Sequence, residues 1–156
     1  MILSGASLFN KSLRCGLALL LSVLTATELQ AAEIKLEGKL IWGTNDAQSP
    51  DAKHKPVDEA TAAKLRKVFK WKNYFVCNKK TKVIPSRGSN HFKLSDDCTV
   101  EITELEGPRV ELKVIGKGVP VHKSIKELRK GDWFVYCGDD KNESAWFVII
   151  RDLDEK

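Results

Sequence analysis

Apolar and polar residues alternate along most of the chain after residue 32, which is the pattern of half-buried β-strands. In residues 98–103, for example, Val100 and Ile102 occupy one side while Thr and Glu occupy the other. The turn at 104–108 leads into 109–115, so these two segments are expected to pair as a hairpin. The predicted strands are residues 33–43, 73–79, 81–85, 91–94, 98–103, 109–115, 119–122, 133–137 and 145–151.

The last two predicted strands differ from the others because they are almost continuously apolar. Both of their faces should therefore be covered, which predicts a central position in a sheet. Many short strands with little helix indicate a mainly β (α+β) fold. We expect an antiparallel β-sandwich or a partly open barrel with one amphipathic helix.

A helical spacing of apolar residues is found at residues 58–70. Ala62, Leu65, Val68 and Phe69 recur on one face, and lysines occupy the other. Asp58 is suited to cap the amino end of this predicted helix. Residues 124–130 fit either a single helical turn or a long connection.

The first 32 residues have the character of a secretory signal peptide. Lys11 and Arg14 form a positive region that precedes an apolar stretch at residues 15–24. Cleavage near Ala32 would leave residues 33–156 as a single β-rich domain, exported to the periplasm or secreted; an uncleaved anchor is the alternative. After residue 32, no uncharged stretch approaches the roughly 18 residues that a membrane span needs.

Positive charge is concentrated in the middle of the chain. The protein has 26 Lys and Arg against 21 Asp and Glu, a net charge of +5, yet residues 64–93, called here the basic segment, contain no acid. The ten bases of this segment are Lys64, Arg66, Lys67, Lys70, Lys72, Lys79, Lys80, Lys82, Arg87 and Lys93. If these bases share one face, the segment would bind a polyanion, with aromatic rings adding apolar contact.

The candidate binding residues are Lys64, Lys67, Lys70, Trp71, Lys72, Lys79, Lys80 and Lys82, with Trp42 as a further exposed ring. The expected partners are an anionic glycan, a lipid surface or an acidic protein, since export disfavours nucleic acid. The alternative interpretation is that the lysines only solvate the outer face of the helix.

Three cysteines follow the leader, and an odd number allows at most one internal disulfide. We expect a bridge between Cys77 and Cys98, because both fall in β segments separated by short hairpin-like pieces; Cys137 could pair with either. No signature of a thiol enzyme surrounds these cysteines, and the closest Cys and His in sequence, His91 and Cys98, are too far apart for a typical zinc motif. We therefore predict no catalytic residue, no metal site and no cofactor.

Residues 69–75 (FKWKNYF), 138–142 (GDDKN) and 145–149 (AWFVI) together resemble a group of exported bacterial proteins in which a helix precedes a β-rich domain. No activity is assigned to that group. The resemblance implies a bacterial envelope setting and supplies no catalytic residue.

The sequence thus favours a non-enzymatic exported protein that binds an anionic envelope component or an acidic partner through residues 64–93. Two other functions stay open. One is a structural or assembly subunit of an envelope complex that pairs through a sheet edge. The other, ranked third, is an enzyme that uses a cysteine thiol.

Overall fold

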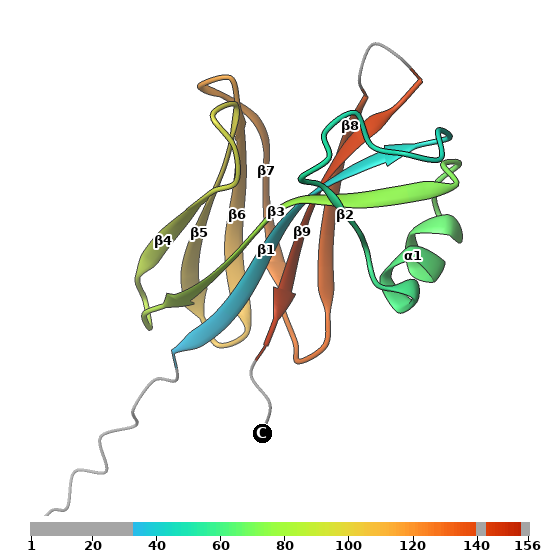
Figure 1. The fold of residues 1–156 in the computed structure, drawn as a ribbon. Helices are drawn as coiled ribbons and strands as arrows, with labels where there is room; N and C mark the ends of the chain where they lie inside the picture. The colour runs from blue at the N-terminus through green and yellow to red at the C-terminus, as the bar shows by residue number, and fades with distance from the viewer. Residues whose placement is uncertain (1–32, 140–142, 154–156) are drawn as a thin grey trace, which may run out of the picture. The chain divides into compact units, whose positions relative to one another are not determined.

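The computed structural model describes residues 33–139 and 143–153 (Figure 1). The predicted signal peptide, residues 1–32, lies outside the described residues. The elements are β1 (Ile34–Thr44), β2 (Lys55–Pro56), α1 (Glu59–Arg66), β3 (Asn73–Ile84), β4 (Ser89–Lys93), β5 (Cys98–Glu106), β6 (Arg109–Gly116), β7 (Val119–Glu127), β8 (Trp133–Asp139) and β9 (Ala145–Asp152).

The strands form two antiparallel sheets. One sheet has five strands in the order β2-β3-β1-β9-β8, and the other has four in the order β4-β5-β6-β7. The described residues are mainly β and contain one short helix, and their two stacked sheets fit a sandwich or open barrel (Figure 1). The predicted fold class is therefore confirmed.

The apolar core between the two sheets is built from alternate positions of the strands. Leu36 and Val148 of the five-stranded sheet are fully buried in it, as are Phe92 and Leu112 of the four-stranded sheet. Gly38 makes room for Phe92, because a Cβ at this position would lie 2.9 Å from Cδ1 of the ring. The sheets can therefore approach closely at this point.

A second apolar layer covers the other face of the five-stranded sheet. Here Ile41, Phe147 and Ile149 of the sheet are buried together with Leu65 of α1 and Trp71 of the segment that follows it. The five-stranded sheet is thus buried on both faces, once against the other sheet and once against the helical segment.

The helix starts where the sequence predicted but ends one turn earlier. Asp58 caps it by accepting a hydrogen bond from the Thr61 amide at 2.8 Å, whereas the last helical residue is Arg66 rather than residue 70. Beyond this point the chain turns so that Phe69 packs edge-on against Phe147, with ring centroids 4.8 Å apart. Val68, predicted on the buried face, is consequently 74% exposed.

Three strand predictions are revised. The two segments predicted at residues 73–79 and 81–85 form one continuous strand, β3, and residues 124–127 continue β7 instead of forming a helical turn. The apolar hairpin β8–β9 is covered on both faces as predicted, but it is not central, because β8 lies at the edge of its sheet.

Candidate functional site

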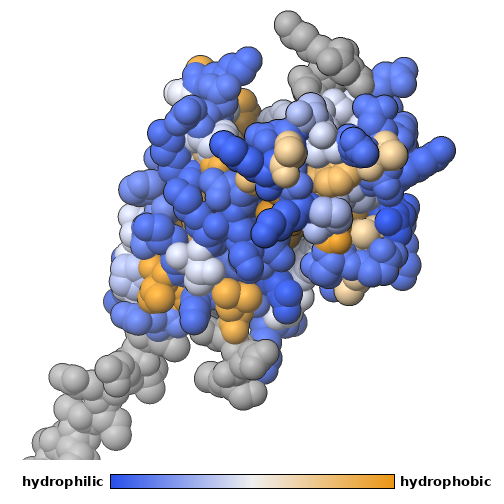
Figure 2. Space-filling view, viewed as in Figure 1, coloured by the Kyte–Doolittle hydropathy of each residue, from blue (hydrophilic) through white to orange (hydrophobic). Residues whose placement is uncertain are grey.

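The bases of the basic segment are distributed over α1, the segment after it, and β3 and β4. Lys64 and Lys70 lie over indole rings, with Nζ at 4.3 Å from the centroid of Trp133 and at 5.2 Å from that of Trp71. Lys67 and Lys72 are exposed. Hydrophilic residues dominate the face of the protein seen in Figure 2, where β3 crosses in front of the sheets.

Along β3 the lysines alternate between two faces of the sheet. Lys82 pairs with Leu36 and Lys80 with Gly38, so both are on the face turned toward the four-stranded sheet. Lys79 is on the opposite face, where it lies beside Lys39. The ten bases therefore do not all share one face, and the expectation of one continuous patch needs correction.

Most of the bases nevertheless have no acidic partner. Three form ion pairs: Arg66 with Glu59 at 2.8 Å, Lys79 with Glu37 at 3.6 Å, and Lys93 with Asp96 at 2.9 Å. The charged groups of the other bases form no ion pair within 4.0 Å among the described residues: Lys64, Lys67, Lys70, Lys72, Lys80, Lys82 and Arg87, whose backbone amide donates to the Glu104 carboxylate.

Trp71 does not offer the exposed ring that we expected. Its side chain is only 6% exposed, and its Nε1 donates a hydrogen bond to the carbonyl oxygen of Glu143 at 2.7 Å. The ring packs edge-on against Phe147, with centroids 5.5 Å apart. Trp71 therefore belongs to the core under the helical segment, because folding this chain back onto the sheet buries the ring.

The predicted disulfide is also absent, since Cys77 and Cys98 are both free thiols. They do, however, line the same cavity. Burial raises the pKa of Cys98 above its ordinary value, and it raises that of Cys77 to about 11. Both thiols are thus protonated at neutral pH.

This cavity has a volume of about 580 Å³ and walls from both sheets. Small-molecule sites commonly have volumes of roughly 300–1,000 Å³ and mostly apolar linings. Leu40, Trp42 and Trp146 line it from the inner face of the five-stranded sheet, and Val121 of β7 faces them. The two tryptophans are direct neighbours across β1 and β9 and are only partly buried. Trp42 therefore offers an apolar surface to this cavity, and not to a partner at the outer surface as we expected.

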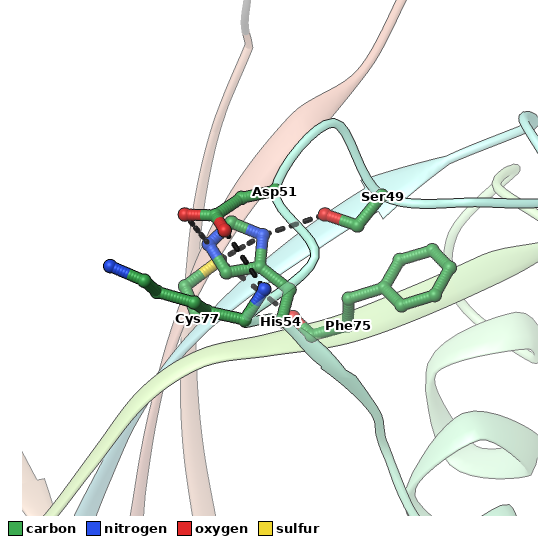
Figure 3. A network of polar contacts seen from close by, with 6 residues as sticks. Ser49, Asp51, His54, Phe75 and Cys77 are labelled. Carbon is green, nitrogen blue, oxygen red and sulfur yellow. Dashed lines mark hydrogen bonds and ion pairs between the residues drawn. The ribbon is translucent and has the colours of Figure 1, made fainter.

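Beside the cavity, a histidine connects three polar side chains (Figure 3). The Nδ1 atom of His54 lies 2.6 Å from Oγ of Ser49 and 3.7 Å from Sγ of Cys77. On the other side of the ring, Nε2 lies 3.8 Å from a carboxylate oxygen of Asp51. A thiol, an imidazole and a carboxylate in this order form the arrangement from which nucleophile and base pairs are built.

The backbone explains why these groups meet. His54 directly precedes β2, and β2 pairs with β3 through Lys55 and Val76. At the next residue β3 contains a bulge, because Ile41 pairs with Val76 while Leu40 pairs with Asn78. Cys77 is the extra residue of this bulge. Bulges re-aim side chains in this way and are frequent next to functional sites.

Sequence reasoning missed this group of residues. Ser49, Asp51 and His54 are close in the chain, but Cys77 is 23 residues away from His54. The spacing of residues along the chain does not show where a strand will contain a bulge. It therefore cannot predict which side chain the bulge will turn toward the loop. The only signal was the presence of His and Cys in the same domain.

Two kinds of feature are not found among the described residues. They contain no helix that is both long and apolar enough to cross a membrane. They also contain no group of three His, Cys, Asp or Glu side chains placed to hold a metal ion. Within the loop at residues 138–144, residues 140–142 lie outside the described residues.

No protein-family profile, curated protein or solved structure matches this chain.

Proposed function

We propose that the protein is a non-enzymatic exported binding module for an anionic envelope component or an acidic partner. The observation that carries this proposal is the set of bases in residues 64–93 that lack a carboxylate partner. Unpaired, exposed ammonium groups attract anions without first having to break an ion pair. A mature chain that starts near residue 33 when recovered from outside the cytoplasm would support the export step; recovery of the full-length chain from the cytoplasm would contradict it.

The bases most suited to this role are Lys67, Lys70 and Lys72. They follow one another closely at the end of α1, all three are exposed, and none has a carboxylate within 4.0 Å among the described residues. Lys80 and Lys82 are on another face, so they would belong to a separate part of the surface. The contact is electrostatic and does not use the buried ring of Trp71.

The test is binding to vesicles of phosphatidylglycerol, with phosphatidylcholine vesicles as the neutral reference. A triple variant, Lys67→Glu, Lys70→Glu and Lys72→Glu, should bind at least roughly 100-fold more weakly, because each base near an anionic surface contributes about 1 kcal/mol. Raising the salt concentration should also weaken the binding of the wild-type protein to these vesicles, because salt screens the attraction.

A matched control carries the same change of charge elsewhere: Lys53→Glu, Lys123→Glu and Lys126→Glu, which are also exposed. It should retain most of the binding. An equal loss in both triple variants would mean that only net charge matters, and an unchanged affinity in the first would disprove the proposal. Repeating both measurements on immobilised heparin distinguishes a glycan from a lipid as the preferred anion.

A second candidate function, assembly through a sheet edge, is favoured by β7. This strand is at the edge of the four-stranded sheet and exposes the apolar side chains of Val119, Val121 and Ile125. Exposed edges of this kind are templates for pairing with another chain. Light scattering should then show an oligomer that resists high salt and dissociates in an Ile125→Lys variant; a monomer at every salt concentration would remove this candidate.

A further inference from the structure

The thiol of Cys77 lies in the wall of the cavity, and the imidazole of His54 contacts that thiol. Two neighbouring residues, Cys98 and Ser49, offer a comparison for the thiol. Cys98 lines the same cavity but has no histidine among its described contacts. Ser49 contacts the same histidine nitrogen, but oxygen in a neutral hydroxyl is a weaker nucleophile than sulfur. The combination of sulfur, base and cavity occurs at Cys77 among the described residues.

We propose that Cys77 accepts an acyl group from an activated ester or thioester whose acyl chain lies in the cavity, with His54 as the base. This goes beyond anion binding, because it uses a different surface and forms a covalent bond. The residues involved are Cys77, His54 and Asp51, none of which belongs to the bases of the basic segment.

The step balances without any other reactant. Sγ of Cys77 attacks the carbonyl carbon of the ester, so that a new S–C bond forms and the bond from that carbon to the leaving oxygen or sulfur breaks. The thiol proton passes to Nδ1 of His54 and then to the leaving group, which departs as an alcohol or a thiol. Cys77 ends as a thioester, and neither partner is oxidised or reduced.

A base within reach matters here because the buried thiol does not ionise by itself at neutral pH. Sγ of Cys77 lies 3.7 Å from His54 Nδ1 and 3.9 Å from the carbonyl oxygen of Phe75. The Ser49 hydroxyl, at 2.6 Å, must turn away from Nδ1 before this nitrogen takes the thiol proton as the S–C bond forms. The ring then becomes positively charged, and the carboxylate of Asp51 near Nε2 offsets that charge. Asp51 is thus a positioning residue and does not touch the substrate.

The lining of the cavity indicates an apolar acyl group. Leu40, Trp42, Trp146 and Val121 offer hydrocarbon and indole surface. The polar part of the lining consists of Ser95, whose Oγ accepts a hydrogen bond from the amide of Asp97, and of the charged residues Asp97 and Lys117. A hydrocarbon chain would be buried against the aliphatic and indole side of the cavity, which is the part that favours an acyl group.

The experiment treats the protein with 4-nitrophenyl decanoate and, for comparison, 4-nitrophenyl acetate. Mass spectrometry should find one decanoyl group per chain, on Cys77, and the decanoyl ester should react faster than the acetyl ester. His54→Gln should slow acylation roughly 100-fold or more, since a positioned base typically contributes 10²–10⁴-fold. Cys77→Ala should abolish the adduct, while Cys137→Ala, a thiol remote from this cavity, should not.

Further variants separate chemistry from binding. Val121 lines the cavity but is exposed, so a larger side chain at this position should narrow the cavity without disturbing the core. In Val121→Trp, acylation by the decanoyl ester should therefore become as slow as acylation by the acetyl ester. Asp51→Asn should lower the rate constant at saturating ester without changing the half-saturating concentration. Circular dichroism checks that each variant is folded.

An acyl group found on Cys98, Ser49 or a lysine would overturn the proposal, as would equal rates for His54→Gln and the wild type. High salt distinguishes this proposal from the proposed function: it should release the protein from anionic vesicles but leave acylation unchanged. Either result can therefore fail while the other holds.

Discussion

At the scale of single residues, the start of α1 shows how one side chain determines where an element begins. Asp58 accepts hydrogen bonds from the Thr61 amide at 2.8 Å and from the Thr61 hydroxyl at 2.7 Å. These bonds pair an amide that the first turn of a helix cannot otherwise satisfy. They also lower the pKa of the Asp58 carboxyl below its ordinary value of 3.8, because they stabilise the ionised form.

Replacing Asp58→Ala should therefore lower the free energy of unfolding by about 1 kcal/mol at neutral pH. Because the pKa is lower in the folded protein, the stabilisation is present above pH 3.8 and disappears as the pH falls through the lowered pKa. Urea unfolding of the variant and the wild type should thus differ at pH 7 and converge in acid. Asp96→Ala, which removes a carboxylate from an exposed turn, should have the smaller effect; an equal loss would contradict the capping role.

At the scale of elements, periodicity predicted what each strand buries but not where the strand lies. Alternation at Val100 and Ile102 correctly placed both in the core between the sheets. In β8–β9, the continuous apolar pattern correctly predicted two covered faces, because Val148 faces the other sheet while Phe147 faces the helical segment. The predicted central position was wrong, since a helix can cover a strand at the edge as well as one at the centre.

The candidate site depends on features that periodicity does not contain. The number of cysteines suggested a bridge, but it gives no distance between sulfur atoms, and Cys77 and Cys98 share a cavity without bonding. The approach of His54 to Cys77 requires both the pairing of β2 with β3 and a bulge at one residue. Likewise, the basic segment was evident from its composition, but its division between two faces followed from the continuous strand β3.

At the scale of the whole molecule, the five-stranded sheet connects two apolar layers that share no buried residue. Phe147 is fully buried in the helical layer, where its ring contacts Phe69, Trp71 and Tyr74. Leu112 is fully buried in the layer between the sheets. Since neighbouring residues of the same strands face opposite layers, the loss of one layer should destabilise the other.

We therefore expect Phe147→Ala and Leu112→Ala to lower the stability of the same cooperative unit. The free energy of unfolding should fall by roughly 3–5 kcal/mol in Phe147→Ala and by roughly 2–5 kcal/mol in Leu112→Ala. In hydrogen exchange followed by mass spectrometry, Phe147→Ala should accelerate exchange in α1, in β1 and β9, and also in β5 and β6, since global unfolding exposes them together. Acceleration confined to α1 would instead mean that the helical segment opens independently of the sheets. In that case the lysines at its end, Lys67, Lys70 and Lys72, would be presented by a segment that can open locally, and their arrangement in the folded structure could not account for anion binding.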